Sequence, residues 1–486
     1  MRYLTADFGS TYTKVTAIDT DVPEIVGTGA AFTTIETDVM EGLHNAFREL
    51  EKEIGKEWTP DKFLCCSSAA GGLKMVASGL VPDLTAKAAR MAAASAGAKV
   101  MKTYSYEITH TEAEEIERLD PDLFLLCGGT DGGNVENIIH NAEVIGRIPG
   151  HFSTVVAGNK AAEEEVARIL TEAGKPFVIT ENVMPNFNSL NIAPAKKCIM
   201  QLFIDRIIEA KGLSKAQERA DNEIIPTPLA VLNACNLLSD GTKNRRGLGE
   251  LLAIDLGGAT TDVYSIGDGS PHEANIMHQG IPEPYSKRTV EGDLGMRYSL
   301  TALSEQLDLD AVAAEVGLTG DKLRDWVARC DADKSTRAET EDEILCEKAL
   351  AKGAVSLATD RHVGHTHKVY SPMGEFFTIN GKDLTLTDHV LGIGGALIHS
   401  ADPTFILDGA TFNISNYDKA KPLKPDFYLD SHYIMASMGL LSEQMPDVAL
   451  ELMLKELVKV GTKKKNNNLE EGHLASQPPR IHPRNE

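Results

Sequence analysis

Short apolar runs alternate with longer segments of helical spacing through the first half of the chain. Tyr3–Phe8 and Thr13–Ile18 flank a glycine turn and predict a strand, a tight turn and a second strand. Asp38–Gly55 repeats its apolar residues at helical spacing. Further strands are expected at Lys62–Cys66, Leu123–Cys127, Thr154–Ala157 and Pro176–Thr180, with an alanine-rich helix at Thr85–Ala96. Strands that alternate with helices predict parallel sheets covered on both faces.

The opening pattern returns in the second half. Two long helices, expected at Ala195–Lys211 and Thr227–Leu238, precede a strongly apolar strand, Leu251–Asp255, a glycine turn and a return strand, Asp262–Ile266. We therefore expect a first lobe at residues 1–240 with an inserted α/β subdomain, and a second lobe at residues 241–460. Residues 461–486 are polar and rich in Lys, Asn and Pro, which predicts a flexible tail.

The two repeated turns carry the same chemistry, because each places an aspartate at a strand end before glycines and hydroxyls. The residues of interest are Asp7, Gly9, Ser10, Thr11 and Lys14 in the first turn, and Asp255, Gly257, Gly258, Ala259 and Thr260 in the second. Glycine lets backbone N–H groups approach phosphate oxygens closely. A carboxylate beside such a turn is suited to holding Mg²⁺ and orienting a water. Two facing turns would clamp one polyphosphate, although either turn alone is also typical of an ordinary β-hairpin.

A third glycine segment ends a strand and enters a helix. It contains Gly392, Gly394, Gly395 and Ala396, which could pack flat against an adenosine or its α-phosphate. Leu397 stands where the dinucleotide-binding G-x-G-x-x-G pattern needs its last glycine, and the chain has no G-x-x-x-x-G-K-[ST] phosphate loop. The phosphate chemistry is therefore expected from the paired turns.

These three segments resemble the phosphate-1, phosphate-2 and adenosine motifs of the actin, Hsp70 and sugar-kinase superfamily. The resemblance implies an α/β fold with two actin-like (ribonuclease H-like) lobes that close on Mg-ATP, with Asp7 and Asp255 as the catalytic and metal-holding residues. Lys14 is expected to stabilise the transferring charge. Ile225 stands before Pro226 where the Hsp70 branch has a glutamate, so no further catalytic carboxylate is assigned.

More specifically, the chain resembles the MutL/GlmL family of glutamate mutase accessory proteins. The segments that carry this likeness include Ser67–Leu73, Gly79–Thr85, Leu126–Asn134, Glu181–Pro185 and Lys287–Arg297. The resemblance implies an ATPase that acts as a reactivating factor, or chaperone, for an adenosylcobalamin-dependent mutase or aminomutase and drives release of damaged cofactor. Its partners would be the mutase subunits, and its cofactors ATP and Mg²⁺.

Two segments of this chain allow two interpretations each. Lys287 and Glu291 are expected to contact the ribose and base, with a structural ion-pair network as the alternative. Gly128–Asn134 is either an anion-binding nest or a strand-to-helix turn capped by Asp131 or Asn134. Neither Asp360–Gly364 nor Asp430–Met435 completes the cobalamin pattern D-x-H-x-x-G, so no histidine ligand to cobalamin is expected.

Composition narrows the classes of function. The net charge of −23 argues against a nucleic-acid surface. No apolar run reaches the roughly 18 residues of a membrane helix, and the N-terminal segment lacks a signal-peptide core, so a cytoplasmic location is expected. A small-molecule kinase of the same fold and a non-catalytic module that binds ATP to set its shape remain alternatives, and a homo-oligomer stays open.

Overall fold

The computed structural model describes residues 1–9, 12–34, 38–68, 74–96, 98–211, 213–273, 275–371 and 374–462. The predicted phosphate-turn residues Ser10 and Thr11, and the predicted tail beyond residue 462, lie outside this part of the chain. None of the helices in the described ranges combines the length and apolar composition of a membrane span.

The first lobe is built on a mixed five-stranded sheet of order β10-β4-β1-β2-β3. Its strands are β1 (Arg2–Phe8), β2 (Tyr12–Asp19), β3 (Glu24–Phe32), β4 (Lys62–Ser67) and β10 (Ile225–Pro226). β1, β2 and β3 pair antiparallel, whereas β4 pairs parallel to β1 and to β10. Helix α1 (Val39–Ile54) packs against β3 and β2, and its ends match its sequence: the Asp38 side chain caps the first turn and Gly55 ends the helix at a φ of 74°.

The second lobe repeats this sheet. Its order is β14-β12-β11-β17-β18-β19, made by β11 (Leu251–Leu256), β12 (Thr261–Ile266), β14 (Ser286–Glu291), β17 (His389–Ile393), β18 (Asp426–Leu429) and β19 (Val458–Thr462). β11, β12 and β14 pair antiparallel, and β17 pairs parallel to β11 and β18, as in the first lobe. This duplicated strand order is that of a two-lobed actin-like, ribonuclease H-like fold, which confirms the predicted fold class.

The inserted unit of the first lobe carries the only fully parallel sheet in the described residues, of order β6-β5-β7-β8-β9. Its strands are β5 (Lys74–Gly79), β6 (Lys99–Ser105), β7 (Leu123–Leu126), β8 (Ser153–Val156) and β9 (Phe177–Ile179). Its helices are a π-helical turn (Pro82–Ala86), α2 (Lys87–Ser95), α3 (His110–Leu119), α4 (Glu136–Arg147), a 3₁₀ turn (Lys160–Ala162) and α5 (Glu163–Glu172). The expectation of parallel sheets holds here and is wrong for the two lobes, whose sheets contain antiparallel hairpins.

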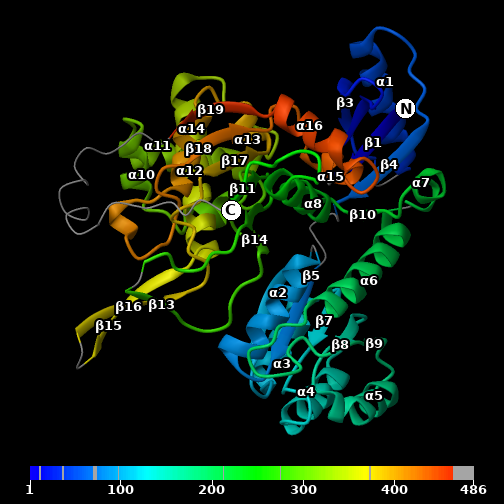
Figure 1. Ribbon diagram of the computed structural model, residues 1–486, viewed down its shortest axis with the longest axis vertical. Helices are drawn as coiled ribbons and strands as arrows, with labels where there is room; N and C mark the ends of the chain where they lie inside the picture. The colour runs from blue at the N-terminus through cyan, green and yellow to red at the C-terminus, as the bar shows by residue number, and fades with distance from the viewer. Residues whose placement is uncertain are drawn as a thin grey trace, which may run out of the picture.

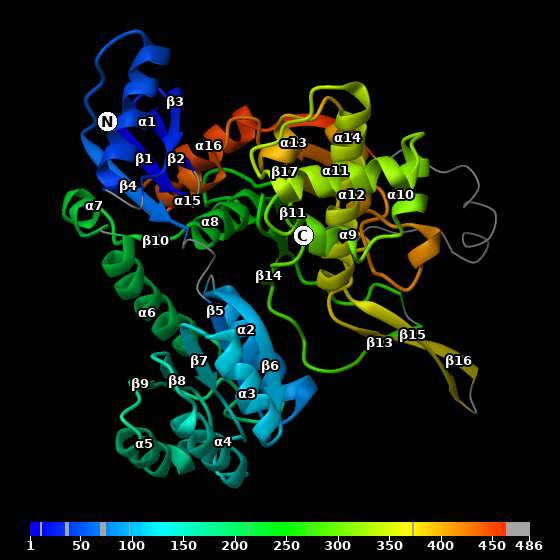
Figure 2. The same cartoon turned by 180° about the vertical axis from the view of Figure 1, so that it is seen from behind.

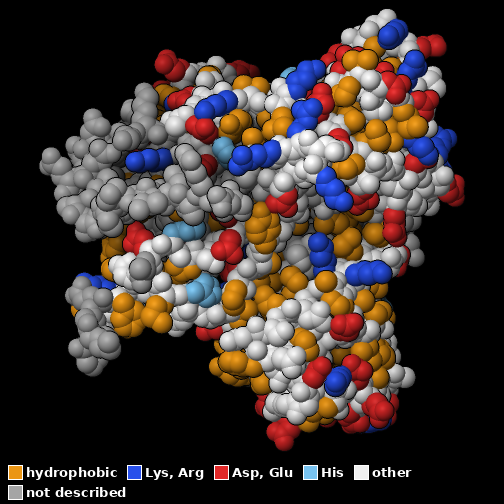
Figure 3. All heavy atoms as spheres, viewed as in Figure 1, with side chains coloured by type: hydrophobic (Ala, Val, Ile, Leu, Met, Phe, Trp, Pro, Cys, Tyr) orange, Lys and Arg blue, Asp and Glu red, His pale blue; other side chains and the backbone are white. Residues whose placement is uncertain are grey.

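Helices join these parts and fill the space between the lobes. α6 (Ala193–Lys211) and α7 (Ser214–Arg219) lead back from the inserted unit to β10, and Figures 1 and 2 show that unit below the lobes. Between the sheets lie α8 (Thr227–Asp240), α15 (Met435–Leu441) and α16 (Pro446–Glu456), whose buried residues share a core with Tyr3, Leu251 and Ala253. Figure 3 shows the inserted unit as a separate lower mass, with a notch between it and the second lobe.

The outer face of the second sheet is covered by further helices. They are α9 (Leu300–Ser304), α10 (Leu309–Glu315), α11 (Gly320–Ala332), α12 (Glu341–His362), α13 (Gly395–Ile398), α14 (Pro403–Leu407) and two 3₁₀ turns (Asp408–Ala410 and Ile414–Asn416). A small sheet of order β13-β16-β15 projects from this lobe, made by β13 (Ile276–His278), β15 (His365–Ser371) and β16 (Gly374–Asn380). α12 is buried along the second sheet, and its Leu350 shares the lobe's own core with Trp326 of α11.

Candidate nucleotide site

Alternation along the two central strands directs both predicted aspartates to the same place. In β1, Leu4, Ala6 and Phe8 belong to the first lobe's core, whereas Tyr3 belongs to the core between the lobes. Asp7 therefore shares the inter-lobe face with Tyr3, since successive side chains in a strand point to opposite faces. Asp255 shares that face with Leu251 and Ala253 by the same alternation. Both carboxylates thus stand at strand ends that meet between the lobes.

The two turns that follow these aspartates have matching geometry. The Gly9 N–H donates to the Tyr12 carbonyl at 3.1 Å, and the Gly257 N–H donates to the Thr260 carbonyl at 2.9 Å. A Cβ on Gly9 would lie 2.4 Å from the Tyr12 carbonyl oxygen, so this turn requires glycine. The strand registers pair Asp7 with Lys14 and Asp255 with Asp262. Lys14 and Asp262 are therefore equivalent positions with opposite charge.

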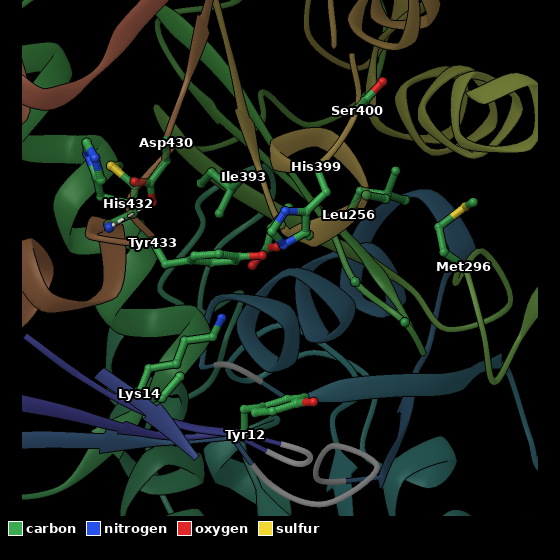
Figure 4. Close-up of a pocket in the computed structure, with 18 of the residues that line it drawn as sticks. Tyr12, Lys14, Leu256, Met296, Ile393, His399, Ser400, Asp430, His432 and Tyr433 are labelled. Carbon is green, nitrogen blue, oxygen red and sulfur yellow. Dashed lines mark hydrogen bonds between the residues drawn. The ribbon is translucent and has the colours of Figure 1, made fainter. Parts of the chain in front are cut away.

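A cavity of about 1270 Å³ opens between the two turns and takes its walls from both lobes. Eight residues singled out from the sequence line it: Asp7, Lys14, Asp255, Gly257, Gly258, Gly394, Gly395 and Ala396. Figure 4 shows Lys14 reaching from a first-lobe strand toward Tyr433 and the segment that carries Ile393 and His399. The structure thus brings Asp7 and Lys14, which flank the first turn, to one cleft with the second turn and the third glycine segment.

Other predicted residues are described but do not line this cavity. They are Gly9, Ala259, Thr260, Gly392, Lys287 and Glu291. Ala259 and Thr260 support the second turn: the Ala259 carbonyl accepts from Ser299, and the Thr260 hydroxyl donates to Asp262. Gly392 lies beneath the site, where a Cβ would meet Leu397 and Leu407 at 3.2 Å, so its small size serves packing.

The structure places Lys287 and Glu291 away from the cleft between the lobes, and both residues form internal ion pairs. In β14 their side chains point to the face that α12 covers. Lys287 pairs with Glu283 and donates to the His362 carbonyl, while Glu291 pairs with Arg361 at 2.7 Å. The expected contact of these two residues with ribose and base is therefore wrong. They belong to a structural ion-pair network, which was the alternative interpretation. Only the end of this sequence stretch reaches the cavity, where Met296 and Arg297 line it.

Asp7 and Asp255 have different surroundings. The Thr227 hydroxyl donates to the Asp7 carboxylate at 2.5 Å, and the Cys66 thiol lies 3.6 Å from the same oxygen. Burial raises the pKa of Asp255 to about 7, with a further rise from Asp262, and Lys14 opposes the shift. Asp255 can therefore hold or release a proton near neutral pH, whereas sequence alone gave the two aspartates equal roles.

A third carboxylate, Asp430, lines the cleft and was not assigned a role from the sequence. It follows β18, is 1% exposed, and accepts the backbone N–H groups of Ile434 and Met435 at 2.9 and 3.0 Å. Burial raises its pKa, while these hydrogen bonds and Lys14 lower it. By the repeated strand order, the residue after β18 occupies the place that Ile225 holds in the first lobe. The equivalence of β18 and β10 in the two sheets is therefore the feature that points to Asp430.

Tyr433 closes the cleft opposite Lys14. The Lys14 Nζ lies 3.7 Å from the centroid of the Tyr433 ring. Tyr433 has a φ of 54°, which is uncommon for a bulky residue. A Cβ on Gly395 would lie 3.0 Å from its hydroxyl oxygen. Burial, Asp255 and Asp430 raise the pKa of Tyr433 to about 12, so the hydroxyl stays protonated at neutral pH.

The glycine-rich turn Gly128–Asn134 is held by its own polar groups. Asn159 accepts from the Gly132 N–H and donates to the Gly133 and Asn134 carbonyls, and Asn182 donates to Asp131 and to the Gly129 carbonyl. The Asn134 side chain accepts the Asn137 N–H at 3.1 Å, one turn into the following helix. These contacts favour the capped strand-to-helix turn over the anion-binding nest.

Comparison with known proteins places the chain in a family. The sequence model of the family described as MutL protein matches residues 3–457. The chain belongs to the MutL protein family. Its likeness to one curated member, Protein MutL of Clostridium tetanomorphum, is 46% identity over 466 residues, covering 94% of this chain and 99% of that protein. The predicted family resemblance is confirmed.

Several solved structures match this MutL family member over most of their length. They include the gluconate kinase of Lactobacillus acidophilus (11% identity, 96% of this chain and 94% of that chain, TM-score 0.35) and a glycerol dehydratase reactivase (9% identity, 91% and 99%, TM-score 0.35). The fold assignment rests on the repeated strand order of the two lobes.

Proposed function

We propose that this MutL family member is an ATP-dependent reactivating factor for an adenosylcobalamin-dependent mutase or aminomutase. Membership of the MutL family supports the mutase partner. The observation that carries the nucleotide part is the cleft itself, in which Asp7 and Lys14 of the first lobe line one cavity together with Asp255, Gly257 and Gly258 of the second lobe. The proposed domains are a first lobe at residues 1–240, a second at 241–460 and a polar tail.

The residues of the cleft fit Mg-ATP. Gly257 and Gly258 line it with backbone that phosphate oxygens can approach, and Gly394 and Gly395 offer a flat surface for the adenosine. Mg²⁺ in such sites is usually held by one or two carboxylates together with substrate phosphates, and Asp7 and Asp255 provide that pair. Bound there, the ion would neutralise charge on the β- and γ-phosphates. Among the described residues, three or more Asp, Glu, His or Cys do not gather into a separate metal cluster.

The chain's own groups would then act as follows. Asp255, with a pKa raised to about 7, can orient a water and accept its proton. Lys14 would leave the Tyr433 ring to stabilise negative charge on the phosphates. Thr227 fixes the Asp7 carboxylate through its hydrogen bond. Since these groups come from different lobes, nucleotide binding would draw the lobes together and exclude water.

Conformational work on a partner requires that the ATP and ADP states differ in affinity for it. The test is a reactivation assay with a mutase inactivated during turnover, supplied with this protein, Mg-ATP and fresh adenosylcobalamin. We expect activity to return, and to stay lost without ATP or with Asp255→Ala. Equal recovery without ATP would overturn the proposal. ATP turnover that requires an added small molecule and no protein would instead support the small-molecule kinase.

A further inference from the structure

The inserted unit touches the second lobe through buried polar contacts between α2 and β14. Arg288, which is 5% exposed, donates to the Asp262 carboxylate at 2.8 Å and to the Ala94 carbonyl of α2 at 3.0 Å. Nearby, Lys87 of α2 lies 3.3 Å from Glu283, which also pairs with Lys287. Figures 1 and 2 both show α2 beside β14. The inserted unit and the second lobe are therefore joined by specific buried hydrogen bonds and ion pairs.

A second cavity, of about 240 Å³, lies in this junction and outside the nucleotide cleft. The inserted unit lines it from α2, from the segment before β6 and from β6, and the second lobe from β14 and α12. The residues are Arg90, Ala94, Ala98 and Val100 on one side, and Thr289, Val290, Glu291 and Arg361 on the other. Its walls thus belong to two parts of the chain, the inserted unit and the second lobe.

Positive charge collects around this cavity, against the acidic balance of the whole chain. Arg90 is exposed and has no ion-pair or hydrogen-bond partner in the part of the chain that is described. Lys99 likewise has none there, and it extends along Gly292, where an added Cβ would lie 2.6 Å from its Nζ. Arg361 faces the cavity from the second lobe, held by Glu291 at 2.7 Å and Asp293 at 2.8 Å. Arg90 lies close enough to Glu291 to lower the pKa of that carboxyl but forms no ion pair with it. Two cationic side chains of the inserted unit can therefore take a further negative group.

The buried groups behind the cavity respond to this charge. The pKa of His362 lies well below its usual value because of burial and because of Lys287, Lys382 and Arg90. Burial lowers the pKa of Lys287, Glu283 opposes this, and Arg90 and Lys87 lower it further. After burial, the neighbouring cations therefore contribute to both shifts.

We propose that this cavity is a second ligand site, which binds a small oxyanion, phosphate or carboxylate, between Arg90 and Arg361. A guanidinium presents its N–H groups in a planar fork that matches both kinds of oxyanion. The anion would connect the inserted unit to the second lobe beside Arg288, whose partner Asp262 is the cross-strand neighbour of Asp255. The site requires no nucleotide in the cleft.

The test is calorimetric titration of the full chain with inorganic phosphate and, separately, with malonate. Each titration is run without and with a non-hydrolysable ATP analogue, which occupies the main cleft. We expect one anion per chain, at least tenfold weaker binding in Arg90→Ala, a smaller loss in Arg90→Lys, and no loss in Arg147→Ala, an exposed arginine of α4. Binding of phosphate alone or malonate alone supports the site and names its ligand class.

Two results would overturn this site. One is that Arg90→Ala binds both anions as tightly as the unchanged chain, and the other is that neither anion binds. A phosphate signal that the ATP analogue removes and Arg90→Ala leaves intact belongs to the nucleotide cleft and counts against the second site. Arg90 does not line that cleft. The effect of Arg90→Ala on anion affinity can therefore still be measured if the proposed ATPase function is wrong.

Discussion

Lys14 of the first lobe and Tyr433 of the second meet across the nucleotide cleft, with the ammonium 3.7 Å from the ring centroid. The contact joins the lobes inside the cavity that Asp255 and Asp430 also line, and Lys14 opposes the rise in their pKa values that burial causes. The uncommon φ of Tyr433 is a kind of strain that often accompanies functional sites. The contact with the ring therefore fixes the position of Lys14, and a phosphate bound in the cleft would compete with the ring for the ammonium.

Substituting Lys14 and Tyr433 one at a time distinguishes their roles. Lys14→Met should weaken ATP binding by about tenfold or more, since it removes a charge that phosphate would use. Tyr433→Leu should leave ATP binding equal or tighter, because a cation–π contact worth about 0.5–2 kcal/mol no longer competes for Lys14. Tyr433→Phe keeps the ring and serves as the control. Similar losses of ATP affinity in Lys14→Met and Tyr433→Leu, measured by calorimetry, would rule out this competition.

Hydrolysis should depend on both strand-end aspartates. Asp7→Ala and Asp255→Ala should each lower the rate of ATP hydrolysis by about 100-fold or more, the usual scale for losing a transition-state contact. Glu53→Ala is a matched control, because this carboxylate lines the outer part of the same cavity. Steady-state phosphate release checks the rates and circular dichroism checks the fold. Unchanged turnover in both aspartate variants would remove them from the chemistry.

The raised pKa of Asp255 predicts a dependence of stability on pH. The folded-state pKa of about 7 exceeds the ordinary value of 3.8, so the folded chain binds more protons between these values. The contribution of this group to stability is thus fully present below pH 3.8 and is lost as pH rises through 7. Asp255→Asn, which imitates the protonated form, should be more stable than the unchanged chain at pH 8, by up to about 4 kcal/mol, since each pKa unit corresponds to about 1.4 kcal/mol.

The difference between this variant and the unchanged chain should be smaller near pH 5, where Asp255 is still protonated in the folded state, and should vanish only below the unfolded-state pKa of 3.8. Denaturant unfolding at the two pH values measures this. A stability difference that does not change with pH would show that the charge of Asp255 costs nothing in the free protein.

Gly395 should be required for adenosine binding. A Cβ there would lie 3.0 Å from the Tyr433 hydroxyl and would enter the cavity. Gly395→Val should therefore weaken ATP binding by about tenfold or more while changing the unfolding midpoint little. Gly258→Ala, where the nearest atom to a new Cβ is 3.7 Å away, should have the smaller effect. Wild-type ATP affinity in a folded Gly395→Val chain would exclude this segment from the site.

Sequence reasoning found the parts of the site that are encoded locally. Asp7 and Asp255 are each followed at once by glycines, so the strand, the turn and the carboxylate can be recognised together. Asp430 follows β18 without such a turn, and its place in the cleft depends on the pairing of β17 with β18. Thr227 reaches Asp7 only because β10 pairs with β4.

The assignment of Lys287 and Glu291 failed for a related reason. Their residue types suit a nucleotide contact, but the face they occupy depends on which side of β14 receives α12. That choice is fixed by tertiary packing, with Arg361 and the His362 carbonyl on the covered face. The Arg288 contact with Ala94 is likewise formed between segments far apart in sequence, so no local pattern could have predicted how the inserted unit joins the second lobe.

The measurement that tests the account most directly is the affinity of an adenosylcobalamin-dependent mutase for this protein in its two nucleotide states. Binding is measured with Mg-ADP and with a non-hydrolysable Mg-ATP analogue, for the unchanged chain and for Asp255→Asn. The account predicts at least a tenfold difference in affinity between the two states, about 1.4 kcal/mol of coupling, and a smaller difference in the variant. Equal affinity in both states, or no binding in either, would contradict it.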